Sequence, residues 1–165
     1  MKPVFKPQTE WVPPESFPDL TKYDEIAIDL ETKDPGLKST GSGSVVGNGN
    51  VVGIAVAVEG WSGYYPIAHE GGGNMDKSMV IKWFTDVLKT PAIKIFHNAM
   101  YDVCWIRSMG LKIEGRIVDT MIAGSLVDEN RFRYDLGSLG RDYVGIGKNE
   151  AVLKETAAHW GIDHK

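Results

Sequence analysis

The chain has 165 residues, 42% of them apolar, and a formal net charge of −4 at pH 7. This length is enough for one sizeable core, and the lack of any run of about eighteen apolar residues excludes a membrane-spanning helix. Because Cys104 is the only cysteine, an internal disulfide and a thiolate zinc site are excluded, and the acidic balance argues against a nonspecific polyanion binder.

The first 23 residues contain no periodic apolar pattern and are rich in proline, which predicts an extended lead-in at 1–23. The domain itself is expected to span residues 24–165. It opens with EIAIDL at 25–30, a short isoleucine-rich run that predicts a buried strand. Residues 36–53 follow, and their glycine, serine and asparagine content predicts a mobile loop.

The middle of the chain predicts a hairpin, a helix, a strand and a second helix. The β-type runs 51–58 and 62–67 are close enough for a hairpin. Helical apolar spacing from Met79 to Leu88 follows a plausible N-cap at Asn74 or Asp76. We expect a strand at 92–96 next, followed by a helix from Asn98 to Met109 that ends at Gly110.

The last third of the chain is expected to be mainly helical. A short strand at 117–118 leads to Asp119, which we expect to cap a helix ending at Val127, and two further helices are expected at 135–143 and 150–160. Antiparallel strands followed by alternating strands and helices predict a mixed five-stranded sheet with helices packed on its faces. This is the layout of a ribonuclease H-like α/β domain.

Asp29 and Glu31 are the first candidate functional residues. Side chains alternate along a strand, so both point to one side at its carboxyl end, where open α/β sheets commonly bind ligands. Two carboxylates this close repel each other, which favours a proton or a cation between them, and oxygen ligands select hard ions such as Mg²⁺ or Mn²⁺. The simpler alternative is that both acids cap the following turn in solvent.

Asn98 and Asp102 are the second pair. They are four residues apart and immediately follow the strand ending at Phe96, so a helix would place them on one face beside the end of the first strand. Taken alone, Asn98 could be only an N-cap and Asp102 only a solvent-facing acid.

Three segments carry a resemblance to a known family. IAIDLET at 26–32, FHNAMYDVCWI at 96–106 and VDTMIAGSLVD at 118–128 resemble the first two exonuclease motifs and the downstream Asp-Thr-Met segment of proofreading domains in family A DNA polymerases, the bacteriophage versions above all. The order and spacing of the three segments are similar to the family's, and their combination is far more specific than any one of them.

The resemblance implies a role for each residue. Asp29 matches the acid that bridges two divalent metal ions, Mg²⁺ or Mn²⁺, while Glu31 matches the acid on the nucleophile-bearing ion and Asp102 the acid on the second ion. Asn98 and the backbone around Thr32 match positions that contact the terminal nucleotide. Asp119 resembles a structural helix cap.

The fourth acid of this Asp-Glu-Asp-Asp superfamily is expected in a Tyr-x-x-x-Asp motif on a later helix. The sequence contains no such motif, so we expect a C-terminally incomplete exonuclease domain that lacks the third motif. Either it is an excised part of a polymerase or it is a divergent stand-alone domain. His159 and Asp163 have a His-x-x-x-Asp spacing, but Gly161 ends the helix between them, and a solvated tail explains them more simply.

Two further groups of residues have open interpretations. Several aromatic side chains could stack on unpaired bases or pack the hairpin and core, and the densest basic stretch could contact phosphates or stay solvated. These aromatic and basic residues are Trp61, Tyr64, Tyr65, Tyr101, Trp105 and Phe132, and Arg131, Arg133 and Arg141. His69 and the glycines at 71–73 predict a turn.

The expected function is two-metal hydrolysis of 3′-terminal phosphodiester bonds of DNA, which is proofreading, by a cytoplasmic enzyme of a bacterium or phage-infected cell. The partners are single-stranded DNA or DNA 3′ ends, with no membrane. Two alternatives are a catalytically incomplete module that binds DNA ends or a partner without cleavage, and another ribonuclease H-like nuclease that trims RNA.

Overall fold

The computed structural model describes residues 11–161, which form two compact units, one ending at Thr120 and the other beginning at Met121. Residues 1–10 of the expected lead-in lie outside this range, and so does Asp163 of the His-x-x-x-Asp spacing. No helix among the described residues combines the length and apolar character that crossing a bilayer requires.

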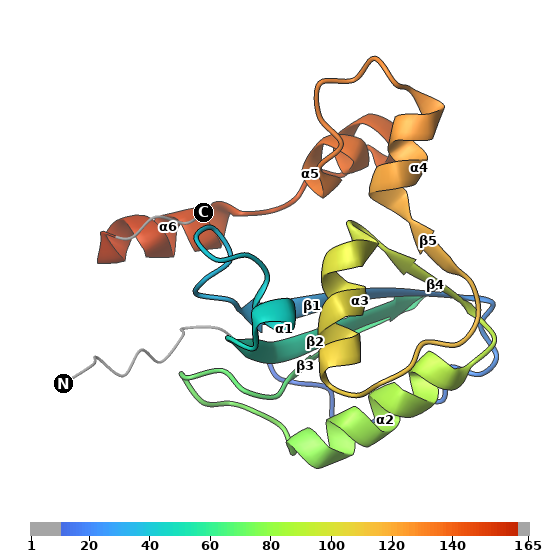
Figure 1. Ribbon diagram of the computed structural model, residues 1–165, viewed down its shortest axis with the longest axis vertical. Coiled ribbons are helices and arrows are strands. Elements are labelled where there is room, and N and C mark those ends of the chain that lie inside the picture. Colours follow the sequence, from blue (N-terminus) through green and yellow to red (C-terminus); the bar gives the residue numbers. More distant parts are fainter. Residues whose placement is uncertain (1–10, 162–165) are drawn as a thin grey trace. The chain divides into compact units, whose positions relative to one another are not determined.

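The first unit is a five-stranded mixed sheet with the strand order β3-β2-β1-β4-β5 (Figure 1). The first three strands are antiparallel neighbours, whereas β1 pairs with β4, and β4 with β5, in parallel. The strands are β1 (Glu25–Lys33), β2 (Asn50–Val58), β3 (Trp61–Pro66), β4 (Ile93–Phe96) and β5 (Ile117–Asp119). The predicted mixed sheet is therefore confirmed.

Two helices of this unit, α2 (Lys77–Lys89) and α3 (Ala99–Ser108), contribute to one apolar core with the sheet. On β1, the alternation predicted from the sequence puts Ile26, Ile28 and Leu30 in this core, while the residues between them are exposed. Asp76 caps α2 by accepting a hydrogen bond from the backbone N–H of Met79. The alternative cap, Asn74, instead bonds the backbone of His69.

The expectation about the glycine-rich loop needs correction. The segment 36–53 was predicted to be a loop throughout, but Gly43–Val46 forms a short helix, α1, and β2 begins at Asn50. Asp34 holds α1 by accepting the Gly43 N–H with both carboxylate oxygens, each at 3.1 Å. The part of the lead-in that is described also packs on the core, since Trp83 donates its indole N–H to the carbonyl of Pro18 at 2.9 Å.

The second unit is made of helices. The predicted helix at 135–143 is a short α-helix, α5, that continues as a π-helix, η1, and the other two predicted helices are present. The helices are α4 (Thr120–Val127, whose first residue closes the first unit), α5 (Leu136–Leu139), η1 (Gly140–Val144) and α6 (Ala151–Trp160).

Lys94 on β4 is fully buried, and its ammonium group is held by oxygen atoms. The Nζ atom donates to the carbonyls of Thr90, Ala92 and Glu114 and to the Thr90 hydroxyl. Burial lowers the pKa of Lys94. A buried polar group is costly only when it lacks partners, and this ammonium group has them. Through these bonds, Lys94 links the end of α2 to the sheet edge.

Lys94→Met is expected to lower the free energy of unfolding by about 2 kcal/mol, because it leaves the buried carbonyls around Nζ without their donor. Urea denaturation measures the change. The matched control is Lys89→Met, at an exposed position on helix α2, and equal denaturation midpoints for the two variants would contradict this account.

Candidate active site

Asp29 and Glu31 lie on the exposed face of β1. Ile28 and Leu30 alternate with them and point into the core on the other face. Both acidic side chains therefore leave the same face of β1, with their carboxylates outside the apolar core.

Asp102 reaches the same strand from α3. The parallel pairing of β1 with β4 ends at Ala27 and Ile95, so β4 provides no acceptor for the backbone N–H of Leu30. Asp102 takes this place, since its Oδ1 accepts that N–H at 3.0 Å. The carboxylate of Asp102 thus bonds the residue that lies between Asp29 and Glu31, and its side chain is only 3% exposed.

The electrostatics of Asp102 reflect this position. Burial raises its pKa to about 7, the Leu30 N–H opposes the shift, and the negative charges of Asp29 and Glu31 raise the pKa further. A buried carboxyl beside two acids is costly to ionise. The three acids expected from the sequence to act together are therefore within electrostatic reach of one another.

The donor set suits a hard divalent cation, because carboxylate oxygens are the ligands that Mg²⁺ and Mn²⁺ prefer. Among residues 11–161, no three His, Cys, Asp or Glu side chains are already arranged to hold a metal ion.

Thr32, near the end of β1, is joined to α3 and to the α1 segment by hydrogen bonds. Its Oγ1 lies 2.7 Å from the hydroxyl of Tyr101, which donates to Asp34 Oδ2 at 3.1 Å. Asp34 in turn holds the N–H of Gly43. The end of β1, the first turn of α3 and the glycine-rich segment are therefore linked by one chain of hydrogen bonds.

Asn98 has the left-handed backbone conformation (φ 64°), and its side chain makes no capping bond to α3. Its backbone N–H and that of Ala99 donate to Asp119, to Oδ1 at 3.0 Å and Oδ2 at 2.8 Å. Asp119 therefore caps the start of α3, and it also lies directly before α4, the helix that it was expected to cap. Asparagine tolerates this left-handed conformation better than most residues. The exposed amide of Asn98 lies at the start of α3, the helix that carries Asp102.

Comparison with known proteins identifies the family of this chain. Residues 8–165 match the family model for the 3′–5′ exonuclease domain of family A DNA polymerases. The chain belongs to this 3′–5′ exonuclease family. A DNA-directed DNA polymerase of Pseudomonas phage M6 is 32% identical to the exonuclease domain over 164 residues. The alignment covers 95% of this chain and 25% of the phage protein, so the chain spans about a quarter of that relative's length.

Solved nuclease structures share the fold of this exonuclease domain. Brucella melitensis NrnC with bound Mg²⁺ aligns with a TM-score of 0.56 at 18% identity, over 81% of this chain and 59% of NrnC. Escherichia coli RNase D, an exoribonuclease, also aligns with a TM-score of 0.56, at 14% identity over 79% of this chain and 30% of RNase D. The ribonuclease H-like fold expected from the sequence is therefore confirmed.

Asp119→Ala in the exonuclease domain is expected to cost about 1–2 kcal/mol of stability, because the N–H groups of Asn98 and Ala99 lose their acceptor at the start of α3. Thermal unfolding of the variant measures this loss. Asp76→Ala is a control that removes the cap of α2 instead, and only the Asp119 variant is expected to weaken Mn²⁺ binding, since only α3 carries Asp102. Equal Mn²⁺ affinities for the two variants would contradict the account.

Sequence reasoning missed Tyr64 and His69. It treated Tyr64 as an aromatic that packs or stacks and His69 as part of a turn, but the Tyr64 hydroxyl and His69 Nε2 are hydrogen bonded. The pKa of Tyr64 is raised to about 12 by burial, then by the charges of Glu31 and Asp29. The alternation along β3 could have placed Tyr64 on one face, but only the strand register shows that this is the face of Asp29.

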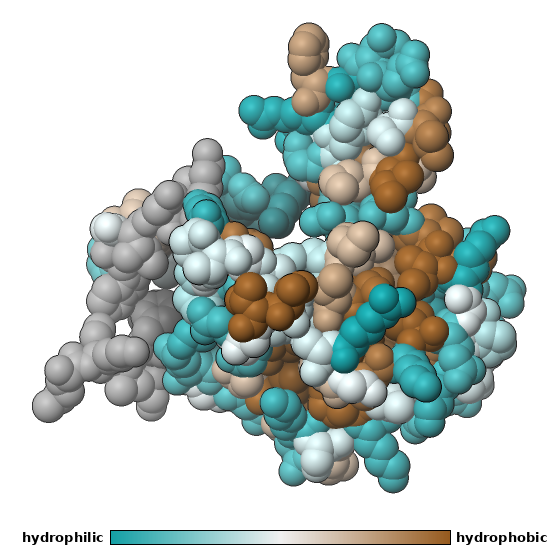
Figure 2. Space-filling model, viewed as in Figure 1, coloured by the Kyte–Doolittle hydropathy of each residue, from teal (hydrophilic) through white to brown (hydrophobic). Residues whose placement is uncertain are grey.

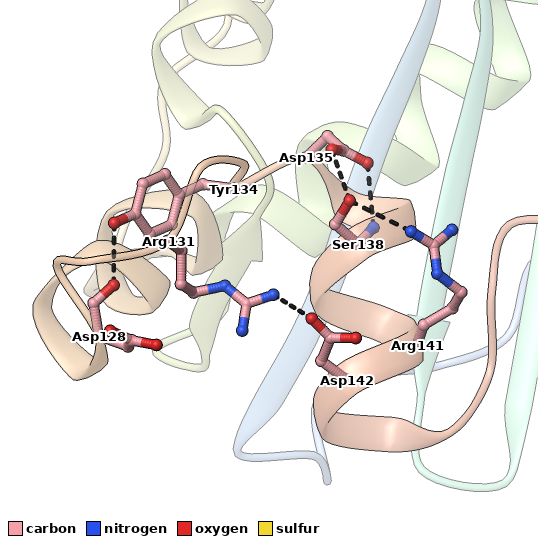
Figure 3. A network of polar contacts seen from close by, with 7 residues as sticks. All are labelled: Asp128, Arg131, Tyr134, Asp135, Ser138, Arg141 and Asp142. Atoms are coloured by element: carbon pink, nitrogen blue, oxygen red, sulfur yellow. Dashed lines mark hydrogen bonds and ion pairs between the residues drawn. The ribbon is translucent and has the colours of Figure 1, made fainter.

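In the second unit of the exonuclease domain, two arginines of the basic stretch, Arg131 and Arg141, have internal partners (Figure 3). Arg131 forms an ion pair with Asp142 and lies over the ring of Tyr143, 5.3 Å from its centroid. Arg141 donates to Ser138 at 3.4 Å, and Ser138 is itself bonded to Asp135. The guanidinium of Arg131 therefore stabilises the unit internally.

Figure 2 shows apolar surface over α4, where Ile122, Leu126 and Val127 are exposed.

Proposed function

We propose that this chain removes nucleotides one at a time from DNA 3′ ends, with Asp29, Glu31 and Asp102 as the ligands of two divalent metal ions, Mg²⁺ or Mn²⁺. The observation that carries the proposal is the Asp102–Leu30 bond, which joins the carboxylate of α3 to the residue that separates the two acids of β1. Such ions would activate a water molecule and stabilise the departing 3′ oxygen.

The individual residues have distinct tasks in this proposal. Asp29 would hold both ions, Glu31 the ion that activates the attacking water, and Asp102 the second ion. Rigid support comes from the core under β1 and from the buried position of Asp102, which limit how far the ligands can drift. The exposed faces of Asp29 and Glu31 leave the approach to the site open to a nucleic-acid strand.

Thr32 and Asn98 are proposed to contact the terminal nucleotide. Because the hydroxyl of Thr32 is already bonded to Tyr101, the backbone near Thr32 is the better candidate for this contact. Asn98 is supported by its exposed amide and by its left-handed backbone, since an unusual conformation that the surroundings hold in place is a reasonable sign of function.

We also propose DNA as the substrate, a polymerase domain as the partner in the parent protein, and the cytoplasm of a phage-infected bacterium as the location. The support is the similarity to a phage DNA-directed DNA polymerase. RNA remains the competing substrate, because RNase D, described as an exoribonuclease, has the same fold.

The test is digestion of 5′-labelled single-stranded DNA in the presence of Mn²⁺. A ladder that shortens by one nucleotide at a time, with release of mononucleotides, is expected, and excess EDTA is expected to stop it. A strand with a blocked 3′ end and a matched RNA strand are run beside it. Preferential digestion of the RNA would overturn the choice of DNA.

The same preparation also tests the non-cleaving alternative. Fluorescence anisotropy with the labelled strand measures binding, and calorimetry measures Mn²⁺ uptake. Tight binding of DNA and Mn²⁺ without release of mononucleotide would refute hydrolysis and identify a module that only binds DNA ends.

A further inference from the structure

Tyr64 and Asp29 lie on the same face of the sheet in one cross-strand row. Asp29 pairs with Ala55, and Ala55 pairs with Tyr64 on the far side of β2. Directly paired residues of antiparallel strands point to the same face. Tyr64 is therefore on the face that carries Asp29 and Glu31, two strands away.

The ring of Tyr64 crosses β2 diagonally toward Glu31. Glu31 pairs with Gly53, and a Cβ atom at Gly53 would lie only 1.9 Å from the Tyr64 hydroxyl oxygen. The phenol thus lies over Gly53, where any larger residue would displace it. Neighbouring strands are about 5 Å apart, so the hydroxyl is brought within one strand spacing of Glu31.

The loop between β3 and α2 (Figure 1) holds this hydroxyl in place. His69 Nε2 bonds the Tyr64 hydroxyl, and the backbone N–H and carbonyl of His69 are both bonded to the side chain of Asn74, at 2.7 and 2.8 Å. Glu70 forms an ion pair with Lys33, two residues beyond Glu31 on β1. The loop is therefore stabilised by hydrogen bonds within it and by an ion pair to β1, the strand that carries the acids.

We propose that Tyr64 is a positioning residue of this site: its hydroxyl, oriented by His69, donates a hydrogen bond to the Glu31 carboxylate and fixes its direction for metal binding. This inference rests on the proposed function. The order of the charges that act on Tyr64 is consistent with it, since Glu31 raises the pKa of the phenol more than Asp29 does.

The proposal requires one tautomer of His69. If Nε2 carries the hydrogen, His69 donates to the phenol oxygen and the phenol O–H is left to donate to an anion. The opposite tautomer would make Tyr64 donate to His69 and leave nothing for Glu31. Nearby carboxylates favour the arrangement that points a hydrogen toward them, so the Nε2–H form is expected.

The first test uses side-chain ¹⁵N NMR of His69 in the metal-free protein, with His69→Gln to assign its signals. The wild type is expected to show the Nε2–H tautomer, and Glu31→Ala is expected to remove this preference. An Nδ1–H form in the wild type, or a tautomer that Glu31→Ala leaves unchanged, would show that the Tyr64–His69 pair only closes the loop and would overturn the proposal.

The second test is calorimetric Mn²⁺ binding without DNA. Tyr64→Phe and His69→Ala are expected to weaken binding about tenfold, as for loss of a hydrogen bond to a charged group. His69→Gln keeps a donor at the Nε2 position and is expected to restore most of the affinity. Tyr65→Phe is the matched control, because Tyr65 points to the core from the same strand and bonds Ser16.

The two tests separate this inference from the proposed function. In a Glu31→Ala background, Tyr64→Phe is expected to cause no further loss of Mn²⁺ affinity, because its effect passes through Glu31, and a full tenfold loss there would overturn the proposal. Both readouts are independent of DNA cleavage. A protein that fails to cut DNA but shows these couplings would retain the positioning role and lose only the nuclease assignment.

Discussion

Asp29→Asn is expected to reduce Mn²⁺-dependent removal of 3′ nucleotides at least about a hundredfold, which corresponds to roughly 2.7 kcal/mol of transition-state stabilisation. In the proposed arrangement, Asp29 is the ligand shared by both ions, so its loss weakens both positions. The substitution keeps the size of the side chain, and the exposed position of Asp29 on β1 spares the core.

Single-turnover digestion of labelled single-stranded DNA at saturating Mn²⁺ gives the rate for this comparison. The control is Asp86→Asn, which neutralises an exposed carboxylate on α2 and is expected to leave the rate within about twofold of the wild type. Unchanged trimming by Asp29→Asn would refute the assignment of the three acids, whatever else the protein does.

The fold could be predicted from the sequence because its apolar patterns are strong and local. The strand at Glu25–Lys33 shows clean alternation, and Asp76 and Gly110 mark the beginning of one helix and the end of another. The short helix α1 was missed, because four residues carry too little periodicity to be recognised. It forms through a distant contact, the bond between Asp34 and the Gly43 N–H.

The candidate site was predictable in part for the same reason. The convergence of Asp102 with Asp29 and Glu31 follows from strand ends that meet at one edge of a sheet. The detailed geometry of the site depends on the pairing of strands that are far apart in the sequence, and no local sequence pattern reveals this pairing. The pairing of β1 with β4 stops after Ala27, which creates the place that Asp102 fills, and the register across three strands brings Tyr64 to the acids.

Asp102→Asn is expected to stabilise the metal-free protein at pH 8 by roughly 2–4 kcal/mol, because the buried carboxylate is charged there and the amide is not. The pKa of Asp102 is about 7 in the folded protein, against an ordinary value of 3.8. A raised pKa means that the group's contribution to stability is fully present below about pH 4 and is lost as the pH rises through 7. The amide oxygen of the variant can still accept the Leu30 N–H.

Urea denaturation of both proteins in EDTA, from pH 4 to pH 8, measures this difference. The other titrating groups are common to both proteins, so the gap between their unfolding free energies is expected to grow from near zero at pH 4 to its full size at pH 8. Excess Mn²⁺ at pH 8 is expected to stabilise the wild type far more than the variant, since a bound cation offsets the charge that makes Asp102 costly. A gap that does not change with pH would show that Asp102 is already ionised in the folded protein near its ordinary pKa, and that its burial has no electrostatic cost for a metal ion to relieve.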